Sequence, residues 1–259
     1  MYRARAIPCL LLRRGGLVKT VRFGQPTYVG DPINAVRIYN EREVDELVVL
    51  DIAATAEGRE PAFSQLAELS TECFMPLAYG GGIRTLEHME RLFTLGVEKI
   101  ILNTVAIEDP SVVRRAANTY GCQSVMVSLD VKKTWLGESR IVTRSGMHDT
   151  KMNPVEAAKR MEQAGAGELL LTSIDRDGTM KGYDLDLIRR VTEAVSIPVV
   201  ACGGAGSLSD FGLAINQAGA AAAAAGSLFV FHGRHRAVLI SYPSQDELLA
   251  ALKPQSKAA

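Results

Sequence analysis

The chain has 259 residues, of which 47% are hydrophobic and 22% are charged, as in an ordinary globular protein. Lys plus Arg and Asp plus Glu number 29 each, so the formal net charge is zero. A neutral chain has no long-range field that favours nucleic acid or an anionic membrane, and neither is expected as a partner. No apolar run reaches the roughly 18 residues of a membrane span. The length fits a single α/β barrel domain over residues 1–259.

The four cysteines occur without a CxxC pair and mostly among apolar or small residues. This usage predicts buried, reduced thiols in a cytoplasmic protein. The N-terminal segment lacks the long apolar region and the cleavage site of a signal peptide. The residues concerned are Cys9, Cys73, Cys122 and Cys202.

No histidine has metal-ligand spacing to other His, Cys or carboxylate residues, so we expect no metal. His88, on an expected helix, and His148, in an expected loop, are interpreted as surface residues. His232 and His235 lie near the last barrel turn. No nucleophile motif occurs, and no GxGxxG follows the first strand, so we expect no cofactor.

Apolar runs of strand length recur along the chain, with helical patterns between them. The expected strands cover 6–11, 47–52, 75–79, 99–103, 124–130, 168–174, 197–202 and 220–225. The expected helices cover 32–44, 61–72, 85–95, 110–119, 154–164, 184–195, 208–218 and 244–252. Six alanines at 220–225 suit a helix equally well, but the regular alternation favours a strand there. Residues 256–259 are expected to be disordered.

Several helix starts are marked by capping residues. Pro32, Pro110 and Pro154 each follow Asp or Asn, which places a capping side chain before proline at the first helical position. The sequence SLSD at 207–210 resembles a capping box.

Eight strands alternating with helices fit a closed barrel or a doubly wound sheet. An internal repeat favours the barrel. Pro76, Gly81, Gly82 and Leu86 recur 122 residues later as Pro198, Gly203, Gly204 and Leu208, and Glu46 and Ile52 recur as Glu168 and Ile174. Half of the chain therefore repeats the other half, which predicts a (β/α)8 TIM barrel with a two-fold half-barrel repeat.

In such barrels the active site lies at the carboxyl ends of the strands. Two glycine clusters lie there, and small residues let the backbone N–H groups of a following helix approach a phosphate. Glycines also make tight turns without any ligand, but two clusters at one repeat offset favour phosphate binding. We expect one phosphate in each half, held by Gly81, Gly82, Asn103 and Thr104 in one and by Gly203, Gly204, Gly226 and Ser227 in the other.

Carboxylates also follow the apolar strands. Asp51 and Asp130 end strands, where burial raises a carboxyl pKa toward the range useful for proton transfer. Thr172, Asp177 and Gly178 belong to the polar segment after another strand. The alternative for each aspartate is a helix cap. At the opposite ends of strands stand Arg5, Glu46, Lys99 and Glu168, which form either a ring of ion pairs on the barrel floor or separate solvated charges.

These residues carry a resemblance to the cyclase subunit of imidazole glycerol phosphate synthase. The match runs from Ile7 to Phe231 through IPCL, GDP, DELVVLDI, GGGIR, LNT, GAGELLLTSIDRDGT, GYDLDL and IPVVACGGAG. The resemblance implies that ammonia from a glutaminase subunit enters through the barrel floor and crosses the centre. It implies that a bisphosphorylated ribulosyl substrate then yields imidazole glycerol phosphate and an aminoimidazole carboxamide ribotide.

The resemblance also implies roles for individual residues. Arg5, Glu46, Lys99 and Glu168 would form an ammonia gate. Lys19, on the first loop, would assist substrate binding, and Asp130 matches one of two catalytic aspartates. The family reads IPCLD at the first strand, whereas this chain reads IPCLLL, with Leu11 at the position of the second aspartate. Loss of a general acid or base typically costs about 10²–10⁴-fold in rate.

One branch of the family shares this departure, and it resembles the chain in GGLVKTVRF, YVGDPINAVRIYNEREVDELVVLDI and FVFHGRHRAVLISYP. This resemblance implies supply of ammonia, with a glutaminase and a sugar amidotransferase, for amidating an O-antigen-type sugar of lipopolysaccharide. The alternatives are an active cyclase and lyase of histidine biosynthesis, a phosphoribosyl isomerase, and a scaffold without a ligand.

Overall fold

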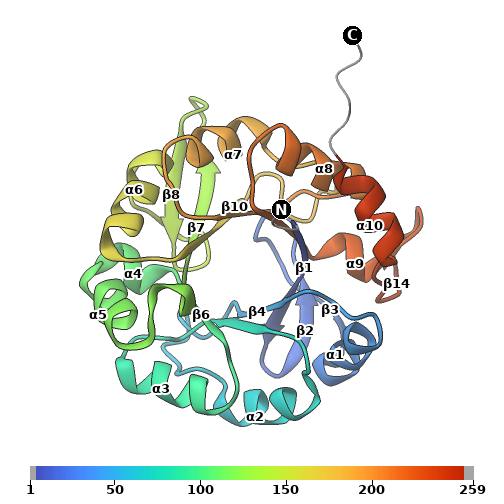
Figure 1. Ribbon diagram of the computed structural model, residues 1–259, viewed down its shortest axis with the longest axis horizontal. Coiled ribbons are helices and arrows are strands. Elements are labelled where there is room, and N and C mark those ends of the chain that lie inside the picture. Colours follow the sequence, from blue (N-terminus) through green and yellow to red (C-terminus); the bar gives the residue numbers. More distant parts are fainter. Residues whose placement is uncertain (1–3, 254–259) are drawn as a thin grey trace.

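The computed structural model describes residues 4–253, and the segment expected to be disordered, 256–259, lies outside them. Eight parallel strands form a closed barrel, because β1 pairs with both β12 and β4 and β7 pairs with both β6 and β10 (Figure 1). The predicted (β/α)8 barrel is confirmed. Its strands are β1 (Arg5–Arg13), β4 (Leu47–Asp51), β5 (Leu77–Gly80), β6 (Lys99–Leu102), β7 (Val125–Lys133), β10 (Glu168–Ser173), β11 (Val199–Cys202) and β12 (Ala222–Ala225).

Helices surround the barrel as an outer ring (Figure 1). The eight expected helices are present as α1 (Pro32–Glu41), α2 (Phe63–Glu72), α3 (Leu86–Thr94), α5 (Ser111–Tyr120), α6 (Pro154–Ala164), α7 (Leu185–Thr192), α8 (Leu208–Asn216) and α10 (Gln245–Leu252). Two short helices were not expected, α4 (Thr104–Glu108) and α9 (Ser227–Val230). They follow β6 and β12 at equivalent places in the two halves, so the repeat extends to them.

Side-chain caps begin most of these helices where the sequence indicates. Asp31 accepts the Asn34 N–H at α1, Asn153 accepts the Val155 N–H at α6, and Ser207 forms the expected capping box at α8. Helix α5 begins one residue later than expected, at Ser111, with Pro110 as its N-cap. Asp109 nevertheless accepts the Ser111 N–H, in the same way as Asn153 accepts the Val155 N–H.

The burial expectations for three of the four cysteines and for His88 were wrong, whereas His148 is at the surface as expected but lies in a strand. Cys122 is exposed, because it lies in the short turn η1 (Cys122–Ser124) between α5 and β7, and Cys73 and Cys202 are only partly buried. His148 belongs to a strand, β9 (His148–Asp149), although it is exposed. His88 is partly buried, because its ring packs edge-on against Phe63.

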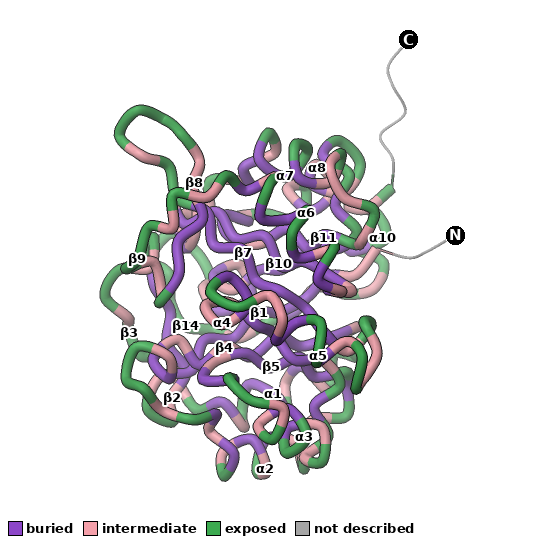
Figure 2. The backbone as a smooth tube through the Cα atoms, turned by 90° about the vertical axis from the view of Figure 1, so that its left-hand side faces the viewer, coloured by how far each residue is buried: buried purple, intermediate pink, exposed green. Residues whose placement is uncertain are grey.

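Short antiparallel strands extend the barrel at the face where the parallel strands end. They are β2 (Gly16–Lys19), β3 (Thr27–Gly30), β8 (Ser139–Thr143), β9, β13 (Phe231–His232) and β14 (Ala237–Val238). Figure 2 places β2, β3, β8, β9 and β14 along one side of the molecule. We call this side the mouth face and the opposite side the floor.

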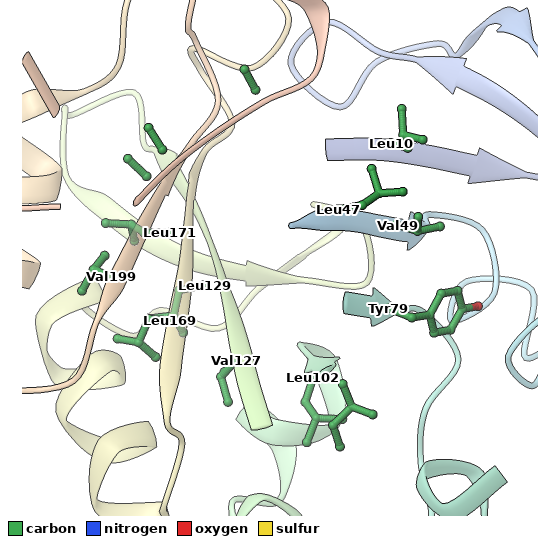
Figure 3. Packing of buried hydrophobic residues seen from close by; sticks show 14 of the residues in the cluster. Leu10, Leu47, Val49, Tyr79, Leu102, Val127, Leu129, Leu169, Leu171 and Val199 are labelled. Atoms are coloured by element: carbon green, nitrogen blue, oxygen red, sulfur yellow. The ribbon is translucent and has the colours of Figure 1, made fainter. Parts of the chain in front are cut away.

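Two apolar cores lie on the two faces of the barrel wall. The larger packs the outward side chains of the strands, including Leu47, Val127 and Leu169, against the helices (Figure 3). The smaller fills the interior with Ile7, Cys9, Leu11, Val48, Ala78, Ile101, Met126, Leu170, Val200, Ala222 and Ala224. Because side chains alternate along a strand, every second residue of β1 from Arg5 to Leu11 points inward. Residues of the floor and of the mouth therefore share the inner face of the same strands.

Candidate active site

One pocket of about 170 Å³ opens at the mouth face. Every residue predicted for the mouth lines it: Leu11, Lys19, Asp51, Gly81, Gly82, Asn103, Thr104, Asp130, Thr172, Asp177, Gly178, Gly203, Gly204, Gly226 and Ser227. Residues that the sequence reasoning missed line it as well, among them Cys9, Phe23, Ser128 and Ser145. Ser128 could have been found, because it lies two residues before Asp130 and therefore on the same face of β7. Phe23 reaches the pocket from the first loop, and no local pattern marks it.

Asp130 is the buried carboxyl group of this pocket, with 8% of its surface exposed. Ser128 Oγ donates to one of its oxygens (3.1 Å) and Asn103 Nδ2 to the other (3.1 Å). Burial raises the pKa of Asp130 to about 7, against the opposing hydrogen bonds from Ser128, Asn103 and Thr172, and Asp177 adds to the rise. A carboxyl group with this pKa can both give and take a proton near neutral pH.

Lys19 lies opposite, at the end of β2, and only 6% of its surface is exposed. Its charge opposes the effect of burial on the pKa of Asp177, which is raised above its usual range. Thr20 Oγ1 also donates to Asp177 (3.2 Å). The first loop is held across the pocket by the Arg22 N–H, which donates to the Asp177 carbonyl (2.9 Å). The mouth pocket thus contains the Lys19 ammonium group together with the carboxyl groups of Asp130 and Asp177.

The two glycine clusters make tight turns as well as lining the pocket. A Cβ on Gly81 would lie 2.5 Å from the Asp51 carbonyl oxygen, and one on Gly204 would lie 2.3 Å from the Gly182 carbonyl oxygen. Both residues have φ near +121°, where a side chain is strained. Glycine is therefore required by the backbone packing alone, so these clusters support a phosphate site less strongly than the sequence suggested.

Hydroxyl groups beside the two glycine clusters test the expected phosphate sites independently of the glycines. Ser227 Oγ is buried, lines the pocket and has no hydrogen-bond partner among the described residues. An unpartnered buried hydroxyl is costly, which favours a ligand oxygen at this place. Its counterpart in the other half, Thr104 Oγ1, accepts the Arg144 N–H (3.1 Å). The two expected phosphate sites are therefore not equivalent in their free hydrogen-bonding groups.

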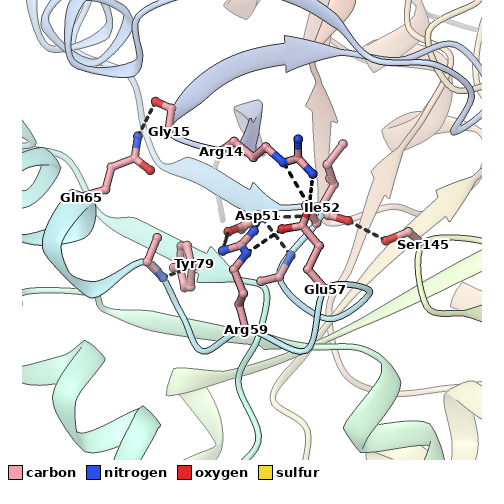
Figure 4. Close-up of polar contacts among 12 residues, drawn as sticks. Arg14, Gly15, Asp51, Ile52, Glu57, Arg59, Gln65, Tyr79 and Ser145 are labelled. Atoms are coloured by element: carbon pink, nitrogen blue, oxygen red, sulfur yellow. Dashed lines mark hydrogen bonds and ion pairs between the residues drawn. The ribbon is translucent and has the colours of Figure 1, made fainter.

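Asp51 is held by the protein itself (Figure 4). One oxygen accepts the N–H groups of Ala53 and Ala54 (3.0 Å each), and Arg59 forms an ion pair with the other (3.2 Å). Glu57 in turn pairs with Arg59 (2.6 Å). This network fixes the loop after β4, so Asp51 organises the pocket wall with both oxygens already bonded.

On the floor, the four charged residues form a closed ring of ion pairs. Arg5 bridges Glu46 and Glu168, and Lys99 Nζ contacts the same two carboxylates (2.9 Å each). The side chains of Glu46 and Glu168 are 3% and 7% exposed, whereas those of Arg5 and Lys99 are 27% and 22% exposed. Of the two alternatives from the sequence, the structure has the ring.

Within residues 4–253, no group of three or more His, Cys, Asp and Glu side chains is arranged to hold a metal ion. Over the same range, no helix is long and apolar enough to cross a membrane.

Comparison with known proteins agrees with this geometry. The family model described as histidine biosynthesis protein matches residues 5–236. A Pseudomonas aeruginosa protein provisionally named imidazole glycerol phosphate synthase subunit hisF2 is 54% identical over 96% of this chain and 99% of its own length. A Leptospira interrogans protein, provisionally named subunit HisF, is 47% identical over 95% of this chain and 98% of its own. The Alkaliphilus metalliredigens protein named imidazole glycerol phosphate synthase subunit HisF is 43% identical over 90% and 92%. The chain therefore belongs to the histidine biosynthesis protein family, within the group of imidazole glycerol phosphate synthase cyclase subunits.

Proposed function

We propose that this barrel receives ammonia from a glutaminase subunit at its floor and conducts it to the mouth for a sugar amidotransferase. The final product would be an amidated surface-polysaccharide sugar of the O-antigen type. The observation that carries the proposal is Leu11, which lines the pocket in which Asp130 is buried. A leucine transfers no proton, so Asp130 lacks the second aspartate that ring closure in the resembled family uses at position 11.

The barrel interior supports passage of ammonia. Between the floor ring and Asp130, the inward side chains form an apolar column that includes Ile7, Val48, Ile101 and Leu170. An apolar column admits neutral ammonia and excludes the ammonium ion, because an unpaired ion pays a large desolvation penalty. The floor ring of Arg5, Glu46, Lys99 and Glu168 would then control entry.

The mouth also supports binding of a phosphorylated ligand. Ser227 Oγ has no hydrogen-bond partner among residues 4–253, and Lys19 supplies a buried cation in the same pocket. Such a ligand would not be consumed in this proposal. It would signal to the glutaminase that the barrel is ready to pass ammonia.

One observation favours the second candidate, an active cyclase and lyase of histidine biosynthesis. The pKa of Asp130 is raised to about 7 by burial, as suits a general acid and base. In this alternative, Asp130 acts with a group other than an aspartate at position 11.

The test is steady-state cyclisation of the ribulosyl bisphosphate substrate with an ammonium salt. We would compare the unmodified chain with Leu11→Asp, and use Leu11→Asn as a control of similar size that cannot transfer a proton. We expect no turnover by the unmodified chain or by Leu11→Asn, and measurable turnover by Leu11→Asp.

The opposite result would be turnover by the unmodified chain at a rate typical of the family, abolished by Asp130→Asn. That result would establish the histidine-pathway function and exclude our proposal. Turnover by both Leu11→Asp and Leu11→Asn would mean that the leucine blocks the substrate by its shape, and that proton transfer at position 11 is not limiting.

A further inference from the structure

A group of cations surrounds loop 174–182, which follows β10 and forms part of the mouth rim. Three guanidinium groups donate to carbonyl oxygens of this loop: Arg22 to Asp175 at 3.1 Å, Arg236 to Gly178 at 3.2 Å, and Arg176 to Lys181 at 3.2 Å. Arg234 lies beside them in the hairpin between β13 and β14. We call the five residues the basic collar: Arg22, Arg176, Lys181, Arg234 and Arg236.

The collar arginines meet backbone carbonyls and, at Arg236, the ring of Phe231 (4.6 Å), but none of these partners carries a negative charge. None of the five residues forms an ion pair with a carboxylate within residues 4–253, whereas Arg140 and Arg144, which also belong to the mouth face, both do. The chain as a whole is neutral, so five neighbouring unpaired cations are a local feature. Like charges held together repel, and an anionic partner would relieve that repulsion.

The collar side chains lie around the pocket, outside its lining. None of the collar side chains lines the pocket, although Thr20, Phe23 and Gly178 beside them do. The collar therefore points to something that covers the mouth from outside. The hairpin of β13 and β14 lies on the mouth face with β2 and β3, in agreement with this position (Figure 2).

Exposed apolar side chains lie on the other side of the same loop. The Lys133 N–H donates to Asp175 Oδ2 (2.8 Å), which ties the hairpin of β7 and β8 to loop 174–182. Trp135 and Leu136, at the tip of this hairpin, are 92% and 65% exposed. Met147 is 70% exposed and lines one groove together with them. Figures 1 and 2 show this hairpin standing out from the body of the barrel.

We propose that the basic collar and the Trp135–Leu136 tip together form the docking surface for the ammonia-consuming enzyme, which seats an acidic, partly apolar face over the barrel mouth. The inference rests on the proposed function and adds the place and the chemistry of the partner. Trp, Met and Arg are the side chains enriched at protein interfaces, and they occur together here. The exposed aliphatic side chains of Leu136 and Met147 beside Trp135 favour a protein over a nucleic acid, because bases stack on aromatic rings and gain little from aliphatic groups. A partner seated there would take up ammonia at its exit, before the ammonia is protonated in bulk water.

Trp135 is the single tryptophan of the chain and offers a direct test. Labelling the chain with 5-fluorotryptophan gives one ¹⁹F resonance, which reports on this surface even when the partner contains tryptophan. The complex of the labelled chain and its glutaminase would be titrated with the purified sugar amidotransferase. We expect the ¹⁹F resonance to shift and broaden, with an affinity that falls as salt is added.

The variant Lys181→Glu/Arg234→Glu reverses two collar charges whose side chains make no hydrogen bond within residues 4–253. Lys159→Glu/Arg160→Glu is the matched control, because it reverses two exposed charges on α6, away from the mouth. We expect the collar variant to weaken binding by about tenfold or more and the control to bind normally. A ¹⁹F signal that does not respond to the amidotransferase, or equal binding by both variants, overturns the docking proposal.

A second readout separates this proposal from the proposed function. Glutamine labelled with ¹⁵N in its amide is supplied together with unlabelled ammonium, and the ¹⁵N content of the sugar product is measured. We expect high ¹⁵N incorporation with the unmodified chain and the control, and dilution to the bulk level with the collar variant. If the ¹⁹F signal responds but no ¹⁵N reaches the sugar, the docking surface stands and the proposed function fails. If ¹⁵N is transferred equally by all three chains, the proposed function stands and the docking surface is wrong.

Discussion

The Nζ of Lys19 lies so close to Gly226 that a Cβ built on Gly226 would come within 1.8 Å of it. The lysine at the end of β2 therefore reaches into the mouth over a position that has no side chain. This contact joins the first loop to the C-terminal half of the barrel. The Ser227 hydroxyl, which has no hydrogen-bond partner in the part of the chain that the structure describes, is found there too. The glycine is thus required by Lys19, independently of any ligand.

Gly226→Ala should displace the Lys19 ammonium from the pocket. We expect binding of the ribulosyl bisphosphate to weaken by about tenfold, which corresponds to roughly 1.4 kcal/mol of lost charge-assisted hydrogen bonding. Isothermal titration would compare Gly226→Ala, Lys19→Met and the double variant. Because both changes remove the same contact, the double variant should bind no worse than Lys19→Met. Additive losses would show that Gly226 acts on the ligand directly.

Asp130 should make the stability of the chain dependent on pH. Its pKa is raised to about 7 in the folded chain from a usual value of 3.8, so the folded state binds the proton more tightly. The stability that this provides is complete below pH 4 and is lost as the pH rises through 7. Asp130→Asn removes this contribution, so its free energy of unfolding should fall less than that of the unmodified chain between pH 4 and pH 8.

The difference for Asp130→Asn should amount to at most about 4 kcal/mol. Urea denaturation at several pH values would measure it. Parallel pH profiles of the two proteins would mean that Asp130 titrates as an ordinary carboxyl group in the folded chain.

Lys99→Met should destabilise the barrel floor. Glu46 and Glu168 are nearly buried and would share Arg5 as their one remaining cation in the ring. Leaving buried charge uncompensated typically costs about 3–5 kcal/mol, and the partial exposure of Lys99 reduces this to about 2–4 kcal/mol. Thermal denaturation would test this, with Lys159→Met on α6 as the control; an equal loss of stability in both variants would contradict it.

Asp51→Asn should lower the free energy of unfolding markedly while leaving ligand affinity almost unchanged. The substitution breaks an ion pair with Arg59 and weakens the bonds to the Ala53 and Ala54 N–H groups. We expect a loss of about 1–3 kcal/mol in the free energy of unfolding. Well below the melting temperature, ligand affinity should change by less than about threefold. A large loss of affinity with unchanged stability would mean that Asp51 contacts the ligand itself.

The sequence by itself determined the barrel, its half-repeat and the residues that line its mouth. The repeated offset between Gly81-Gly82 and Gly203-Gly204, and the placing of polar residues after apolar strands, follow from local periodicity and duplication. These signals do not depend on distant contacts. The four alanines of β12 form a strand because β1 and β11 pair with them on either side, whereas their own propensity favours a helix.

Only the tertiary structure decided how those residues are used. Three contacts join segments that fold back on one another: Asp51 with Arg59, Lys19 with Gly226, and the four charged residues of the floor ring. No local sequence pattern shows which atoms meet in these contacts. The pKa of Asp130 likewise depends on how deeply the barrel buries it. The basic collar assembles from segments around 22, 178 and 234, so its unpaired charge becomes visible only when the barrel closes.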